Sequence, residues 1–323
     1  MIRLSAILMG AASAAPFAVQ ARDIPLAFPV ACTLGQSCFI QNYVDRDPSE
    51  RVADFTCGPL SYDGHQGTDV ALPSLIAMEE GVDVLSAAPG VVRGTRDALP
   101  DISFRDEAAP DLQGRDCGNG VAIDHGDGWT TQYCHLRQGS VSVHTGQRVG
   151  AGQVIGQIGL SGMTEFPHLH FTVRRRDVVV DPFDTAADGA CGTAASTPLW
   201  REPIAYDPSG PLSAGLAADV PEWEAIKAGG IEATTDAHGA LVLWAAFFGG
   251  REGDEVRLAI SGPEGPVHED VVPVERTQAQ FFRASGLRAP ERGWPPGRYE
   301  GRAALVRGDE VVDAQTVSTV LSR

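Results

Sequence analysis

The sequence predicts a mainly β protein, with an antiparallel β domain followed by a β-sandwich. The chain has 323 residues, enough for two domains of ordinary size. Its 37 glycines and 22 prolines supply the many turns that short-stranded β folds need. Short apolar runs bounded by turn residues recur along the chain. A hydrophobic fraction of 43% with 21% charged residues is typical of a globular protein.

The first residues have the pattern of a secretory signal. Arg3 supplies a positive charge, Leu4 to Ala12 form an apolar run too short to cross a bilayer, and Val19-Gln20-Ala21 fits a small-x-small cleavage site. We therefore predict a signal peptide at residues 1–21. Past it we expect no membrane span, because no later apolar run is long enough. The mature protein is predicted to be periplasmic or secreted.

The net charge of −17 limits the possible partners. A chain this acidic is a poor match for the phosphates of nucleic acid and for an anionic membrane surface. We expect neither as a partner.

The cysteines are even in number, and an exported protein meets an oxidising environment. Cys32 and Cys38 flank a short turn and are predicted to pair. Cys117 and Cys134 lie at similar distances from the turn at residues 125–128, so they can face each other across a hairpin. This leaves Cys57 with Cys191, although the six residues allow other pairings. No CxxC spacing is present, which disfavours a thiolate zinc site.

Composition divides the chain after the signal. Residues 22–59 form an irregular lead-in, and residues 60–195 carry the distinctive His, Asp and Gly residues. A stretch rich in Ala, Ser, Pro, Gly and Asp predicts a linker at residues 196–220. Within the first domain, the polar residues 97–116 read as an inserted loop.

Residues 221–323 are predicted to form a small antiparallel, immunoglobulin-like sandwich. A short helical turn is expected near Trp223 to Ile226, and strand-like runs then follow at regular spacing. These runs are Leu241–Phe248, Val256–Ile260, Val267–Val274, Gln280–Ala284, Tyr299–Val306 and Val311–Val320. These residues carry none of the His, Asp and Gly motifs found upstream, so a spacer or a module that binds a protein partner is expected.

The hairpin and the strand after it carry most of the chemistry. Gly120–Asp124 and Trp129–Tyr133 read as a hairpin with a Gly and Asp turn. The later strand, Phe166 to Val173, contains His168 and His170. Residues i and i+2 of a strand project to the same face, roughly 7 Å apart. The two imidazoles can share a zinc site, or one can ligate while the other moves protons.

A turn lined by glycines offers two further ligands. His65 and Asp69 lie four residues apart, and the glycines let the backbone double back so that both groups aim at one point. His170 would complete a set of three protein ligands with a fourth place for water. This open arrangement is typical of catalytic rather than structural zinc.

These motifs resemble a known family. His65-x-Gly67-x-Asp69, Tyr133-x-His135-Leu136 and His168-x-His170-Phe171 are similar, in order and spacing, to the lysostaphin/LytM type of M23 zinc metallopeptidase. The similarity extends over residues 60–183 and includes Gly118–Gly126 and Gly146–Gly156. It implies that residues 60–195 adopt an antiparallel LytM-like fold and cleave peptide bonds in peptidoglycan.

The resemblance also implies roles for single residues. His65, Asp69 and His170 would match the ligands of one Zn²⁺, and His135 and His168 the catalytic histidines. The zinc would activate a water for attack on a peptide carbonyl, and the catalytic imidazoles would orient it and carry its proton. The inserted loop and residues 160–167 depart from the family pattern, which leaves the substrate preference open.

Two other functions remain as alternatives. The same fold could serve as a non-enzymatic regulator that binds and activates a cell-wall amidase, although such relatives usually lack some ligands. A peptidase acting on peptides outside the wall is also compatible with the sequence. Of the other candidates, His125 is expected to serve the hairpin turn, Tyr133 and Trp129 to pack, and His144, His238 and His268 to be solvated.

Overall fold

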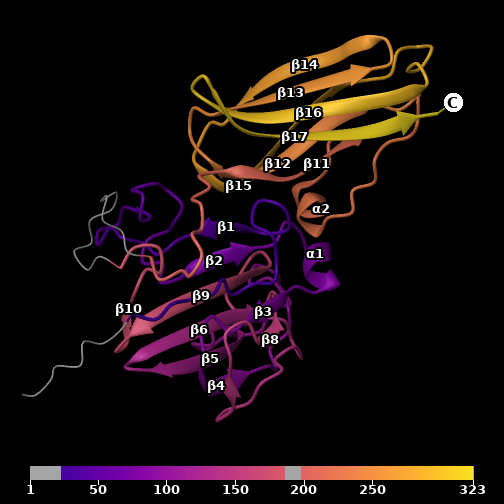
Figure 1. Cartoon of the computed structure of the whole chain (residues 1–323). Helices are drawn as coiled ribbons and strands as arrows, with labels where there is room; N and C mark the ends of the chain where they lie inside the picture. The colour runs from indigo at the N-terminus through magenta and orange to yellow at the C-terminus, as the bar shows by residue number, and fades with distance from the viewer. Residues whose placement is uncertain (1–22, 186–197, 323) are drawn as a thin grey trace, which may run out of the picture.

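The computed structural model describes residues 23–185 and 198–322 (Figure 1). The predicted signal peptide and Cys191, with the proposed Cys57–Cys191 pair, lie outside these residues. In the part of the chain that is described, no helix is both long enough and apolar enough to span a bilayer.

The mainly β class with antiparallel sheets is confirmed. The first unit is built on a sheet of order β1-β2-β9-β6-β5-β4-β7, in which neighbouring strands pair antiparallel and β10 lies beside β9. A small pair, β3 and β8, and one short helix complete it. The bounds are β1 Phe39–Asn42, β2 Thr68–Ala71, α1 Leu75–Glu80, β3 Asp83–Leu85, β4 Gly90–Arg96, β5 Asn119–Gly126, β6 Trp129–Leu136, β7 Arg148–Val149, β8 Val154–Gln157, β9 His168–Arg175 and β10 Val178–Val179.

The predicted hairpin is formed by β5 and β6. Its connection is Asp127-Gly128, and both residues have positive φ, 52° and 82°. This is the primed two-residue turn whose twist matches that of the flanking strands. The predicted disulfides Cys32–Cys38 and Cys117–Cys134 are both present.

The histidine strand alternates as predicted. Leu169, Phe171 and Val173 are at most 1% exposed and pack in the core of the first unit. The intervening residues therefore lie on the other face of β9, which carries His168 and His170.

The second unit consists of two sheets that share one apolar core. The sheet β11-β12-β15 and the sheet β14-β13-β16-β17 both contribute to it, including Leu243, Phe247, Leu258 and Leu305. The bounds are β11 Gly210–Ala217, α2 Trp223–Ala228, β12 Leu241–Gly250, β13 Glu255–Gly262, β14 Gly265–Pro273, β15 Gln278–Leu287, β16 Gly297–Arg307 and β17 Glu310–Leu321. The runs predicted from the sequence all fall on strands, with slightly different bounds.

The proposed boundaries need two corrections. The predicted linker at residues 196–220 contains β11, which pairs with β12, so the second unit begins near residue 210 and not at 221. The lead-in at residues 22–59 contributes β1 to the main sheet and buries Leu26 and Tyr43 in its core. These short strands were missed because Pro and Ser residues near residue 210 and turn residues at 45–50 are typical of loops.

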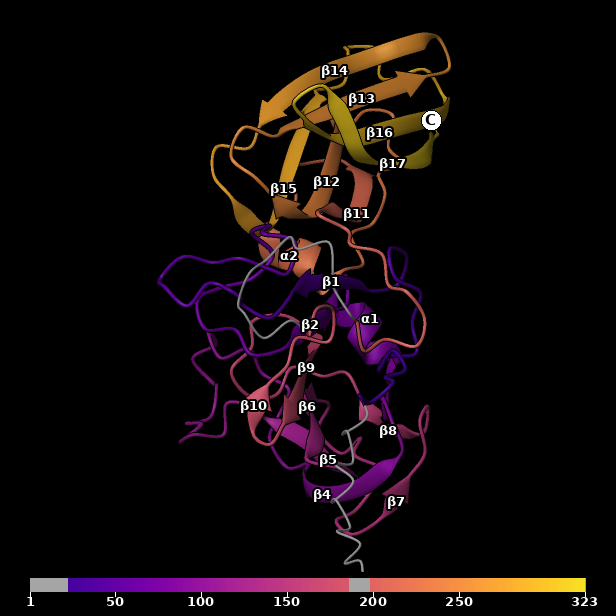
Figure 2. The same ribbon diagram turned by 60° about the vertical axis from the view of Figure 1, so that its left-hand side comes forward.

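Strand β12 is apolar on both faces, and this determines how the units meet. Every second residue of β12 faces the sandwich core, namely Leu241, Leu243, Ala245 and Phe247. The alternate residue Trp244 packs with α2, and Phe248 stacks on Phe39 of β1, with ring centroids 4.7 Å apart. The two units therefore share an apolar contact, with α1 and α2 beside it (Figures 1 and 2).

A buried charge cluster lies beside the main sheet. The Arg46 guanidinium is 3.4 Å from Asp184 and 3.7 Å from Asp181, and these side chains are at most 5% exposed. Among the residues that the structure describes, this cluster places one cation between two carboxylates. Burial, helped by the neighbouring Asp184, raises the pKa of Asp181 to about 7 against the pull of Arg46.

Replacing Asp181 with asparagine is expected to stabilise the protein increasingly as pH rises from 4 to 8. The pKa of Asp181 is near 3.9 in an unfolded chain, so between the two values unfolding releases a proton and wild-type stability falls with pH. The asparagine side chain does not titrate, and its oxygen can still accept from the Phe183 amide, as the Asp181 carboxylate does. The full difference is roughly 4 kcal/mol by linkage. Urea unfolding of both proteins across this range measures it, and parallel stability curves would contradict the shifted pKa.

Candidate metal and catalytic site

Three predicted residues converge on one point. His65 precedes β2, Asp69 lies in β2, and His170 lies opposite Asp69 in β9. The His170 Nδ1 is 2.8 Å from Asp69 Oδ1, and the His65 Nε2 is 3.2 Å from Asp69 Oδ1 and 3.1 Å from His170 Nδ1. Ligands of a tetrahedral zinc lie about 3.3 Å from one another. The three atoms thus have the spacing of one metal's ligands.

The outer atoms of these side chains are held by other groups. His65 Nδ1 donates to the Tyr43 carbonyl at 2.7 Å, and His170 Nε2 contacts Thr172 Oγ1 at 3.1 Å. The Asn42 amide donates to Asp69 Oδ2 at 3.0 Å. A carbonyl oxygen can only accept, so His65 carries its proton on Nδ1 and keeps its Nε2 lone pair for a metal. This donor set of two imidazoles and one carboxylate fits Zn²⁺.

His135 and His168 lie beside this ligand set, and both are buried. Their ring centroids are 4.7 Å apart, and His168 Nε2 is 3.5 Å from Asp69 Oδ1. His135 Nδ1 donates to the Ser161 carbonyl at 2.8 Å, and His168 Nδ1 to the Phe166 carbonyl at 2.9 Å. Both rings therefore present an unprotonated Nε2, which is the atom a general base uses.

Burial also sets the charge of these groups. It lowers the pKa of His135 well below the usual range, and the neighbouring His168 lowers it further. Burial likewise lowers the pKa of His168, against the pull of Asp69. Both imidazoles are thus neutral near pH 7. Burial alone would raise the pKa of Asp69, but the adjacent His65 and His168 outweigh it and hold the pKa well below its usual range.

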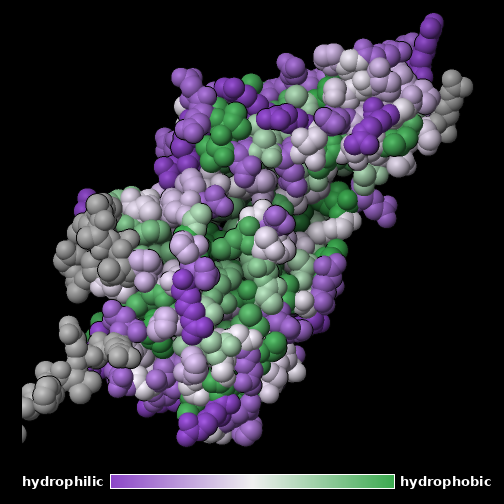
Figure 3. All heavy atoms as spheres, in the orientation of Figure 1, coloured by the Kyte–Doolittle hydropathy of each residue, from purple (hydrophilic) through white to green (hydrophobic). Residues whose placement is uncertain are grey.

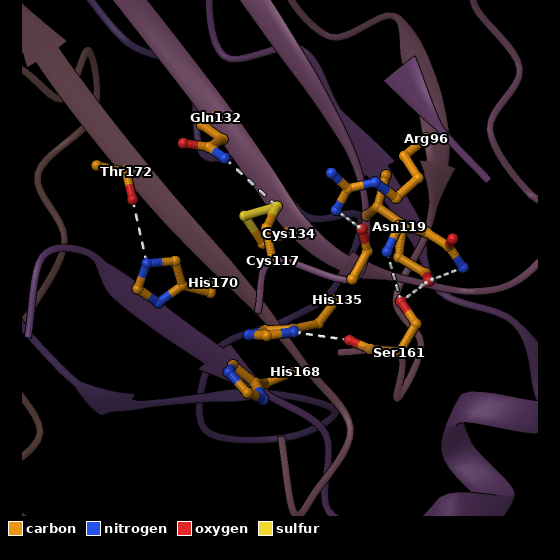
Figure 4. Close-up of a disulfide and its surroundings, with 12 residues drawn as sticks. Arg96, Cys117, Asn119, Gln132, Cys134, His135, Ser161, His168, His170 and Thr172 are labelled. Atoms are coloured by element: carbon orange, nitrogen blue, oxygen red, sulfur yellow. Dashed lines mark hydrogen bonds between the residues drawn. A yellow bond between two sulfur atoms is a disulfide. The ribbon is translucent and has the colours of Figure 1, made fainter. Parts of the chain in front are cut away.

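The backbone around His135 is constrained on both sides. His135 has φ 62°, a left-handed conformation that is uncommon for a residue with a side chain. Its amide donates to the Cys117 carbonyl at 2.8 Å, next to the Cys117–Cys134 disulfide (Figure 4). The Ser161 hydroxyl bonds the Leu136 carbonyl and accepts from the Asn119 amide. Hydrogen bonds of Ser161 with Asn119 and Leu136 therefore fix the position of the Ser161 carbonyl that accepts from His135.

Gly67 leaves the space that His170 occupies. A Cβ at this position would lie 2.7 Å from the His170 ring and 2.9 Å from the Phe171 carbonyl. Both contacts are too short for a real side chain, and the carbonyl belongs to the backbone of β9.

Replacing Gly67 with alanine is therefore expected to displace the His170 ring and to weaken metal binding by about 10- to 100-fold, as loss of ligand orientation does elsewhere. Competition with a chromophoric zinc chelator measures the affinity. Gly64 offers a matched control, because no atom lies within 4 Å of a Cβ built there, although its φ of 72° adds backbone strain. A G67A protein with unchanged affinity would show that His170 does not depend on this space.

Asp69, His135 and His168 line a cavity of about 660 Å³. The inserted loop contributes Phe104 to its lining, and the divergent segment 160–167 contributes Met163 and Phe166. The Phe104 amide donates to the Thr164 carbonyl at 3.1 Å, so the two departures from the family pattern are joined.

The remaining candidates lie away from the ligand set. His125 bonds the Pro89 carbonyl and Thr131, and Tyr133 is fully buried with its hydroxyl accepting from Ala87. Trp129 is buried under the Arg175 guanidinium. His144 and His238 are exposed, as predicted, but His268 is half-buried and bonds Ser285 at 2.8 Å.

Sequence reasoning missed the residues that orient the ligands. Asn42 and Tyr43 come from the lead-in, and they reach the site because β1 pairs with β2 with Asn42 opposite Asp69. Thr172 could have been found, because it follows His168 and His170 at the same two-residue interval and lies on their face of β9. Nothing local to Asn42 distinguishes it in the sequence.

Comparison with known proteins bears on these residues. Residues 63–182 match the model of peptidase family M23. The chain is 33% identical over 114 residues to the cell division protein DipM of Caulobacter vibrioides, and 35% identical over 116 residues to the peptidoglycan DD-endopeptidase ShyA of Vibrio cholerae. These matches cover 34% and 35% of this chain but only 16% and 21% of the relatives, so the chain aligns with a small part of each.

Among solved structures, a zinc containing peptidase from Vibrio cholerae matches at 28% identity with a TM-score of 0.34. The match covers 49% of this chain and 39% of that one.

Proposed function

We propose that this chain, which carries a domain of peptidase family M23, is an exported zinc-dependent endopeptidase that hydrolyses peptide bonds in peptidoglycan. One observation carries the proposal. The free ligand atoms of His65, Asp69 and His170 converge, and two neutral imidazoles stand beside them. The ShyA match gives the substrate class, since that relative is named a peptidoglycan DD-endopeptidase.

The ligand set supports the metal, and the two histidines support the chemistry. His65, Asp69 and His170 would hold a zinc ion, which would supply a coordinated water with a pKa around 7 and a positive charge to polarise a peptide carbonyl. The Nε2 atoms of His135 and His168, left unprotonated by the Nδ1 hydrogen bonds, would accept the proton of the attacking water and pass it to the leaving amine. Their carbonyl acceptors, Ser161 and Phe166, keep the Nδ1 protons in place during these transfers.

Export is supported by the cysteines and by the sequence of residues 1–21. The disulfides Cys32–Cys38 and Cys117–Cys134 persist in oxidising compartments such as the periplasm. We therefore propose a periplasmic or secreted enzyme.

The alternatives differ from this proposal in what they need from the site. An amidase-activating regulator needs the fold but no ligands, and the convergence of three ligand candidates with two histidines beside them weighs against it. A peptidase for peptides outside the wall would need the same site with another substrate.

Digestion of purified sacculi separates these functions. The full-length protein is expected to release peptide fragments whose masses report a cut cross-link or stem peptide. A chelator should abolish release and added zinc should restore it. Release that is unchanged by the chelator would contradict a metal-dependent mechanism. Hydrolysis of free peptides without release from sacculi would favour the third function, and activation of an amidase without release would favour the second.

A further inference from the structure

The groove that leads to the histidines is lined by both units. The cavity at the site is joined by a second one of about 540 Å³. The two share lining residues from both units, namely Glu165, Phe166, Lys227 and Gln280. They therefore form one groove along the seam between the units, where apolar side chains gather across the middle of the molecule (Figure 3).

The wall contributed by the second unit is held firmly. Phe39, Ala71 and Phe248 form a buried apolar cluster across the seam. The Gln280 amide of β15 bonds the Gln41 side chain of β1 at 2.5 Å. At the end of α2, a Cβ at Gly229 would lie 2.9 Å from Ser74, so this helix end packs closely on the first unit. These contacts fix the position of the second unit beside the groove.

The charges along the cavity nearest the site do not balance. Its acidic residue Glu165 is paired with Arg105 at 2.9 Å, and Lys227 is paired with Glu224 at 2.8 Å. Asp69 belongs to the ligand set. Arg276, which precedes β15, is exposed and has no hydrogen bond or ion pair among the residues that the structure describes. A chain of net charge −17 thus leaves one cation unmatched inside its groove.

We propose that the second unit forms one wall of the substrate groove and that Arg276 binds a carboxylate of the peptide substrate. This inference rests on the proposed function. A planar guanidinium matches a carboxylate with two parallel hydrogen bonds. Cross-linked stem peptides end in free carboxylates, so the unmatched cation and the proposed substrate are complementary. The C-terminal unit is then a specificity element and not a spacer.

The test measures binding in a protein that does not turn over its ligand. The probe is a fluorescently labelled, cross-linked stem-peptide dimer prepared from sacculi, and its partner is the same dimer with its free carboxylates converted to amides. Anisotropy titrations use the full-length chain with His135→Asn, alone and combined with Arg276→Gln or Arg276→Lys. The matched control is Arg302→Gln, an exposed arginine of β16 outside both cavities.

Arg276→Gln is expected to weaken binding of the acidic dimer about three- to fivefold, the upper end of the range for an exposed ion pair. It should leave the affinity for the amidated dimer unchanged. Arg276→Lys should recover only part of the loss, because an ammonium keeps the charge but not the two parallel hydrogen bonds. Arg302→Gln should bind like the parent.

Other outcomes overturn the inference. Equal affinity of the parent for the acidic and amidated dimers would show that no carboxylate is recognised. An equal loss in Arg276→Gln and Arg302→Gln would reduce the effect to overall charge. Failure of the proposed function gives a different result from failure of this inference. In that case the wild-type protein would release no fragments from sacculi, whatever the dimer titrations show.

Discussion

Replacing His170 with alanine is expected to remove the metal and the hydrolytic activity together. The His170 Nδ1 is 2.8 Å from Asp69 Oδ1 and 3.1 Å from His65 Nε2, so its loss leaves two protein ligands. A site with two ligands binds zinc far more weakly than one with three. The metal content of the protein after dialysis, measured by mass spectrometry, should fall from about one zinc per chain to near zero. Release of fragments from sacculi should fall to background.

The matched control for this change is Thr172→Ala. Thr172 contacts the outer nitrogen of His170 and is not a ligand. Its loss should weaken zinc binding about 10- to 100-fold without abolishing it. A His170→Ala protein that retains a full equivalent of zinc would refute the ligand assignment.

Replacing His135 is expected to leave zinc in place and to lower turnover by about 10²- to 10⁴-fold, the usual contribution of a positioned acid or base. His135 donates to Ser161 with one nitrogen and presents the other beside His168, so it bonds no ligand atom. Asparagine is the better substitute, because His135 has φ 62° and asparagine tolerates this conformation more readily than alanine. The readouts are metal content and the rate of fragment release.

Zinc loss as complete as in His170→Ala would mean that His135 is a ligand and that the division of roles is wrong. His168→Asn provides the parallel case. If His135 acts as a base and His168 holds the water, the two variants should differ in the pH dependence of the remaining rate.

Local geometry indicated part of the candidate site, because the His65 and Asp69 turn and the strand with His168 and His170 are short motifs. His135 and the roles of all five residues rested on the family resemblance, and these roles stay predictions. The i and i+2 positions of His168 and His170 in a strand place both on one face of β9, where both approach Asp69 Oδ1, at 3.5 and 2.8 Å. The hairpin and its disulfide were predictable for the same reason, since a Gly and Asp turn fixes which residues face each other.

The rest depends on contacts between distant segments. Asn42 reaches Asp69 only through the pairing of β1 with β2, and no local pattern reveals which strand a short apolar run will join. Strand β11 lay hidden in a stretch whose composition is typical of linkers. Arg276 enters the groove through the packing of one unit on the other, which is set by the outer face of β12.

That outer face has a practical consequence for anyone who wishes to trim the protein to a minimal enzyme. Truncating the chain before β11 would expose Phe39 and Ala71 to solvent, and the second unit produced alone would expose Phe248. Solvent-exposed aromatic surface of this kind promotes aggregation of protein fragments. Each unit covers apolar surface of the other, so the full-length chain is the form to purify and assay.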